Sequence, residues 1–64
     1  MNSLDKLIMM ANQIAANLGH EADPVEATAN HILLFWDPRM KAMIRAHPAK
    51  GLSPTAAAAI ARLG

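Results

Sequence analysis

Apolar residues in the first third of the chain recur every three or four positions, which is the spacing of one face of an α-helix. They are Leu4, Leu7, Ile8, Ala11, Ile14, Ala15 and Leu18. Met9 falls on the other side of this segment, and Met10 lies at the edge of the stripe. Asn2 or Ser3 can cap the segment, and Gly19 stands where a helix can end. The pattern predicts a first helix from Ser3 to about Leu18.

A second helix is predicted from Asp23-Pro24 to about Trp36. Asp23 is a good N-cap, Pro24 suits the first helical position, and Glu26 can close a capping box. One apolar face holds Val25, Ala29, Ile32 and Trp36, and another holds Ala27, His31, Leu34 and Phe35. A short helix that is apolar on two faces is either central in its own core or partly covered by another molecule.

Two further helices are predicted, each again beginning with a capping residue and a proline. The third begins at Asp37-Pro38 and ends at Pro48, and a loop to Leu52 follows. Its apolar face holds Met40, Met43, Ile44 and His47, and its opposite face holds Lys41 and Arg45. The fourth begins at Ser53-Pro54, is rich in alanine, and has a narrow stripe of Ala56, Ile60 and Leu63.

These segments together predict an all-α fold. No stretch shows the period-two alternation of β-branched residues that is typical of a strand. Pro38 disfavours helical geometry at Asp37, so the second and third helices meet at a sharp Asp-Pro corner. With 64 residues the chain has room for one small helical domain, which we assign to residues 1–64.

The composition limits the classes of protein that fit. Charged residues make up 17% of the chain, against about 25% in an average soluble domain. The formal net charge of +1 argues against a partner bound mainly through charge, such as bulk nucleic acid or an anionic membrane. There is no cysteine, so disulfides and thiol chemistry are excluded. A small apolar chain without such cross-links needs good helix packing or a second chain, and we expect it to be marginally stable or self-associating when isolated.

The sequence predicts a soluble cytoplasmic protein without membrane contact. A spanning helix needs about 20 mostly apolar residues. The longest uncharged stretch, from Leu7 to Gly19, contains Asn12, Gln13 and Asn17. Near the start, Asp5 precedes Lys6 and no uninterrupted apolar run follows, which is unlike a signal peptide.

The residue types needed for catalysis or cofactor binding do not occur in useful patterns. No two of the three histidines, His20, His31 and His47, lie three or four positions apart, so no single helix presents a pair of metal ligands. The hydroxyl and carboxylate side chains fall mostly at helix starts, and the glycines form no phosphate-binding loop. We therefore expect no metal, no cofactor and no catalytic residue in this chain.

Two joined helices with Arg39, Lys41 and Arg45 on the later one leave a second hypothesis open, a small dimerising module that binds DNA or another regulator. The alternative is that these residues form the solvated face of a short helix, which the small net charge and the missing polar recognition set favour. We therefore expect no nucleic acid partner, and salt-sensitive binding to DNA would test this.

The stretch from His31 to Met40, H-I-L-L-F-W-D-P-R-M, is the most informative. It contains both aromatic rings of the chain, Phe35 and Trp36, as neighbours at the corner. Adjacent helical residues point about 100° apart, so the two rings cannot easily both face one small core. One ring can therefore be offered outward beside Arg39, and a large aromatic residue next to an arginine is typical of a binding hot spot.

The same stretch brings a family resemblance. M-A-N-Q-I-A at Met10 to Ala15, then H-x-x-x-F-W-D-P-R-M from His31 to Met40, then an alanine-rich helix ending in Leu63, resembles the delta subunit of NAD-dependent formate dehydrogenases that contain molybdenum or tungsten. The resemblance extends over nearly the whole chain and implies no catalytic residues. The matching motif consists of His31, Phe35, Trp36, Asp37, Pro38, Arg39 and Met40, which we predict to bind the partner.

The resemblance also implies a function. In that family the delta subunit is a small accessory chain without a cofactor, and it supports assembly or stability of a cytoplasmic complex. Its partners would be the pterin-containing alpha subunit and the flavin and iron–sulfur subunits. The composition of the chain is consistent with this function, because a short apolar chain without a catalytic pair is best explained as part of a larger assembly.

Overall fold

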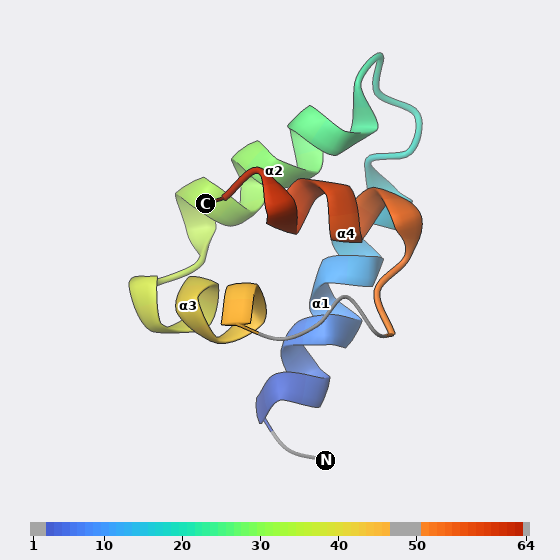
Figure 1. Ribbon diagram of the computed structural model, residues 1–64. Coiled ribbons are helices and arrows are strands. Elements are labelled where there is room, and N and C mark those ends of the chain that lie inside the picture. Colours follow the sequence, from blue (N-terminus) through green and yellow to red (C-terminus); the bar gives the residue numbers. More distant parts are fainter. Residues whose placement is uncertain (1–2, 47–50, 64) are drawn as a thin grey trace.

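Four helices make up most of the part of the chain that the computed structural model describes, residues 3–46 and 51–63. They are α1 (Ser3–Asn17), α2 (Pro24–Phe35), α3 (Pro38–Ala46) and α4 (Pro54–Ala61) (Figure 1). No strand occurs among the described residues, so the predicted all-α fold is confirmed. The residues expected to end α3 and begin the next loop, His47, Pro48 and Ala49, lie outside the described part.

The last three helices begin where the sequence predicts. Side-chain oxygens of Asp23, Asp37 and Ser53 each accept a hydrogen bond from the backbone N–H three residues later, at 3.1, 2.8 and 3.2 Å. A proline follows each cap as the first helical residue, where the missing N–H leaves no hydrogen bond unmade. These starts need no tertiary contact, which is why the local sequence predicts them.

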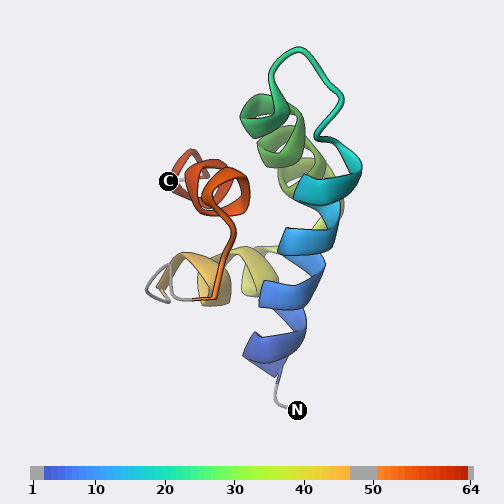
Figure 2. The same cartoon turned by 90° about the vertical axis from the view of Figure 1, so that its right-hand side faces the viewer.

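The core is formed by the predicted faces of all four helices. It consists of Leu7, Ala11, Ala15, Ile32, Trp36, Ile44, Ala56 and Ile60. Helix α1 contacts each of the other three, and α2 lies beside α4 above α3 (Figures 1 and 2). Alanines at Ala11, Ala15 and Ala56 let the helix backbones approach closely, because their side chains are short.

The end of α2 differs slightly from the prediction. The helix ends at Phe35, and Trp36 takes an extended conformation while its N–H still bonds the Ile32 carbonyl at 2.9 Å. The reason is the following cap. Asp37 must leave helical geometry to cap α3 and to precede Pro38, so the chain turns one residue earlier.

A polar clamp that the sequence pattern does not reveal fixes the start of α4 against α1. The Asn12 amide donates to the Gly51 carbonyl at 2.9 Å, and its oxygen accepts from the Ser53 N–H at 2.8 Å. Gly51 has φ +87°, a backbone conformation that favours glycine. The clamp therefore depends on both the amide of Asn12 and the conformational freedom of Gly51.

Candidate functional site

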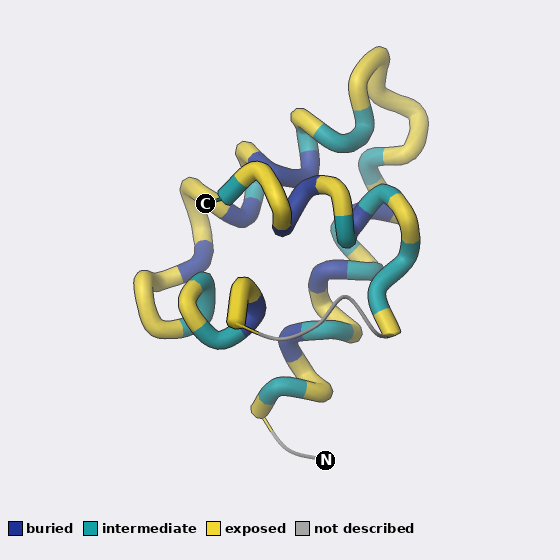
Figure 3. The backbone as a smooth tube through the Cα atoms, in the orientation of Figure 1, coloured by how far each residue is buried: buried dark blue, intermediate teal, exposed yellow. Residues whose placement is uncertain are grey.

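The two aromatic rings at the end of α2 have opposite environments. Trp36 is 5% exposed and packs in the core, whereas Phe35 is 72% exposed. Their neighbour Leu34 is even more open, at 76%, and Leu33 is also exposed. The exposed turn between α2 and α3 is visible in Figure 3. The structure therefore shows which ring is offered outward, and it is Phe35.

A shallow apolar groove, which we name the corner groove, lies between α1 and the α2–α3 corner. Its volume is about 430 Å³, and its lining consists of Met10, Gln13, Ile14, His31, Phe35, Trp36 and Met40. Four of the seven residues predicted to bind the partner thus line one groove. The other three, Asp37, Pro38 and Arg39, do not line it.

The exposed ring is supported from one turn earlier in α2. The centroids of the His31 and Phe35 rings lie 4.7 Å apart, with the ring planes tilted by 42°. Residues four apart on a helix share a face, and such tilted ring pairs add about 0.5–1.5 kcal/mol beyond simple burial. His31 is half-buried. Its ring limits the positions that the Phe35 ring can take.

Of the predicted residues outside the groove, Asp37 and Pro38 set the geometry of the corner, and Arg39 is exposed to solvent. The Asp37 carboxylate accepts from the Met40 N–H, and Pro38 opens α3. Arg39 is exposed, and the described residues offer it no ion pair, neither with Asp37 nor with Glu26. The Lys41 ammonium donates to the Leu33 carbonyl at 3.3 Å and so ties α3 to the last turn of α2.

Sequence reasoning missed the contribution of α1 to this groove. Met10, Gln13 and Ile14 line it although they precede the corner motif by many residues. The only signal was the position of Met10 at the edge of the apolar stripe. Leu33 was also missed, whereas Leu34 lies on the second apolar face that the sequence predicted for α2.

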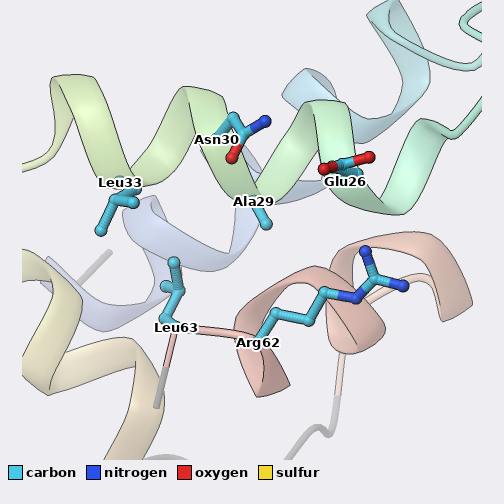
Figure 4. Close-up of a pocket in the computed structure, with 6 residues that line it drawn as sticks. All are labelled: Glu26, Ala29, Asn30, Leu33, Arg62 and Leu63. Carbon is cyan, nitrogen blue, oxygen red and sulfur yellow. The ribbon is translucent and has the colours of Figure 1, made fainter.

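A second groove lies on the other side of α2, against the end of α4 (Figure 4). Its volume is about 370 Å³, and it is lined by Glu26, Ala29, Asn30, Leu33, Arg62 and Leu63. Figure 4 shows Leu33 and Leu63 together at one end and the two charged side chains at the other. Arg62 also lies 4.0 Å from a carboxylate oxygen of Asp23.

The described residues contain no group of three or more His, Asp or Glu side chains that could hold a metal ion. None of the described helices is long and apolar enough to cross a membrane. The clustered features are exposed apolar side chains, an arginine without an ion pair and two open grooves. This combination suits recognition of another protein surface.

Comparison with protein families identifies a match. The family model described as NADH-dependent formate dehydrogenase delta subunit FdsD matches residues 6–60, which include the whole corner motif. No curated protein and no solved structure matches the chain. The match confirms the resemblance read from His31 to Met40 and from the flanking helices. The chain therefore belongs to the family of NADH-dependent formate dehydrogenase delta subunits.

Proposed function

We propose that this chain is a non-catalytic accessory subunit of a cytoplasmic formate dehydrogenase complex, and that it supports assembly or stability of that complex. The observation that supports this most directly is the exposure of Phe35 within the region that matches the family model. A large apolar ring left in water at a structured corner is unfavourable for an isolated chain and useful at an interface. The partner in this proposal is the pterin-containing alpha subunit, with the flavin and iron–sulfur subunits as further contacts.

Covering the Phe35 ring with a partner surface would contribute substantially to the free energy of binding. A phenylalanine buries about 150–250 Å² when fully covered, and 72% of the Phe35 side chain is still open. Covering this exposed part removes roughly 110–180 Å² from water, which contributes roughly 3–4.5 kcal/mol at about 25 cal/mol per Å² before the cost of association is subtracted. That is the size of a hot spot.

Arg39 adds a polar contact from the same corner motif. It lies in the first turn of α3, where the positive end of the helix dipole slightly disfavours a cation. A partner carboxylate or carbonyl at this position would accept bidentate hydrogen bonds from the guanidinium. In this proposal Phe35 and Arg39 make the main contact, Met40 and His31 complete the groove, and Asp37 and Pro38 hold the corner in shape.

The test is co-purification of a tagged copy with the formate dehydrogenase subunits, followed by identification of the partners. Phe35→Ala and Arg39→Ala should each weaken the complex by at least about 2 kcal/mol, while the helix content of the chain stays unchanged. Met9→Ala is the matched control, because Met9 is also exposed but does not line the groove. Unchanged recovery and formate oxidation in both variants would place the contact elsewhere on the surface. A wild-type chain that recovers no dehydrogenase subunit contradicts the proposed function itself.

A further inference from the structure

The small net charge conceals a strong segregation of charge along the chain. All five carboxylate side chains stand at or before Asp37, together with Lys6 as the only cation of that part. The other five Lys and Arg residues all follow Asp37. Charge divided in this way produces a polarised surface if the fold keeps the two sets apart.

The fold keeps only part of the two sets apart, because Asp37 caps α3 and Arg62 lies close to Asp23, while Asp5 stands at the start of α1. Three carboxylates and three cations are nevertheless carried by different elements. Glu21, Asp23 and Glu26 lie in the α1–α2 connection and the first turn of α2, whereas α3 contributes Arg39, Lys41 and Arg45. Figures 1 and 2 both show the α1–α2 connection at the top of the molecule and α3 in its lower half. The longest dimension of the fold is 32 Å, about four Debye lengths at physiological ionic strength. Charges at opposite ends of this dimension are therefore largely screened from each other.

The two ends also differ in how many of their charged side chains have an oppositely charged side chain nearby. At the acidic end Arg62 lies 4.0 Å from Asp23, and the His20 ring lies 3.2 Å from Glu21. On α3, Lys41 bonds a carbonyl, while Arg39 and Arg45 are exposed and form no ion pair with any described residue. The carboxylate that is nearest to them in sequence, Asp37, accepts the Met40 N–H. The α3 surface therefore has a net positive charge that described parts of the chain do not neutralise.

The helix dipole of α3 has opposite effects on the two arginines, because they stand at opposite ends of the helix. Arg45 stands in the last turn of α3, where the helix dipole favours a cation. Arg39 stands in the first turn, where the dipole disfavours it. Arg39 also precedes Met40, which lines the corner groove. No ion pair with a described residue and no favourable helix dipole stabilises the charge of Arg39, which adjoins a residue of the open corner groove. This indicates that a negative group of a binding partner contacts Arg39.

We infer that the outer surface of α3 docks on an acidic surface of the partner subunit, with Phe35 inserted beside it and the acidic α1–α2 end turned away. This inference rests on the proposed function and specifies the chemistry of the partner's surface. Complementary potentials raise the association rate and fix the orientation of docking.

Two other occupants explain the observations less well. Nucleic acid would match the cations, but it would leave the exposed Phe35 and the apolar corner groove without a role, since nucleic acid interfaces are polar and strongly positive. A second copy could lay its acidic end on α3 and close as an antiparallel pair, but Glu21 and Asp23 at that end already have His20 and Arg62 within 4.0 Å. An acidic protein surface with an apolar site accounts for both features.

The experiment measures binding of the wild-type chain to formate dehydrogenase purified without its delta subunit, by surface plasmon resonance in NaCl from about 50 to 500 mM. We expect the association rate to fall at least tenfold over this range, because salt screens complementary charges. Arg39→Glu/Arg45→Glu should lower the association rate about tenfold at the lowest salt and abolish most of the salt dependence. If that variant loses helix content, Arg39→Gln/Arg45→Gln replaces it, with a smaller change in the same direction.

Two controls make the result specific. Arg62→Glu reverses one charge at the acidic end, half the change of the α3 double variant, and should alter the association rate less than twofold. Glu21→Gln/Glu26→Gln should leave it unchanged or raise it slightly, because those groups face away from the partner.

Three results would overturn the inference. Tight binding that neither salt nor the α3 variants change would show that the partner surface is not acidic, and would leave the proposed function intact. Absence of binding to the dehydrogenase at every salt concentration would remove the proposed function and the inference with it. Binding of duplex DNA that depends on both α3 arginines, with no dehydrogenase binding, would assign the cations to nucleic acid.

Discussion

Thr28 offers a direct measurement of what an unpaired buried hydroxyl costs this small fold. Its side chain lies in α2 and is completely buried, and its Oγ1 has no hydrogen-bond partner among the described residues. An unsatisfied buried polar group costs about 1–3 kcal/mol. Thr28→Val replaces the hydroxyl with a methyl group of similar size and hardly changes helix propensity. We therefore expect the variant to be more stable by about 1–2 kcal/mol.

The assay is urea and thermal unfolding of the purified chain, followed by circular dichroism at 222 nm. For a domain of this size each kcal/mol shifts Tm by about 4–8 °C, so the melting temperature should rise by roughly 4–16 °C. Thr55→Val is the matched control, because Thr55 is only partly buried and the change should stay within about 0.5 kcal/mol. A Thr28→Val variant that is less stable than wild type would refute the reasoning, since it would mean that the hydroxyl is bonded in solution.

Three further predictions follow from the sequence and the fold. The isolated chain should be marginally stable or self-associating, as measured by sedimentation and thermal melting; a concentration-independent monomer melting above about 70 °C would contradict this. It should bind no metal, flavin or pterin, so elemental analysis should find no stoichiometric metal and the absorbance spectrum should show only Trp36. Asn12→Ala should lower the free energy of unfolding by about 1–3 kcal/mol because it removes both hydrogen bonds of the clamp; urea titration measures this, and a loss below about 0.5 kcal/mol would show that the clamp does not hold α4.

Local sequence was sufficient to predict where the helices begin. An oxygen-bearing cap followed by proline satisfies one backbone N–H and removes the need for another, and both effects act within four residues. The starts of α2, α3 and α4 at Pro24, Pro38 and Pro54 therefore agree with prediction. The apolar faces were predictable for the same reason, because helical spacing alone aligns Leu7, Ala11 and Ala15. The family was also readable in the residues of the corner motif.

The tertiary structure decided everything that depends on how the helices are turned against one another. Periodicity gives α2 two apolar faces, but the rotation of α2 in the bundle decides that Trp36 enters the core and Phe35 faces water. The corner groove needs α1 beside that corner, and the clamp joins Asn12 to Gly51 across 39 positions of sequence. Charge behaves in the same way. The sequence determines the number and order of the charged residues. Only the packed helices decide which of them form an ion pair within the described part of the chain and which, like Arg39, do not.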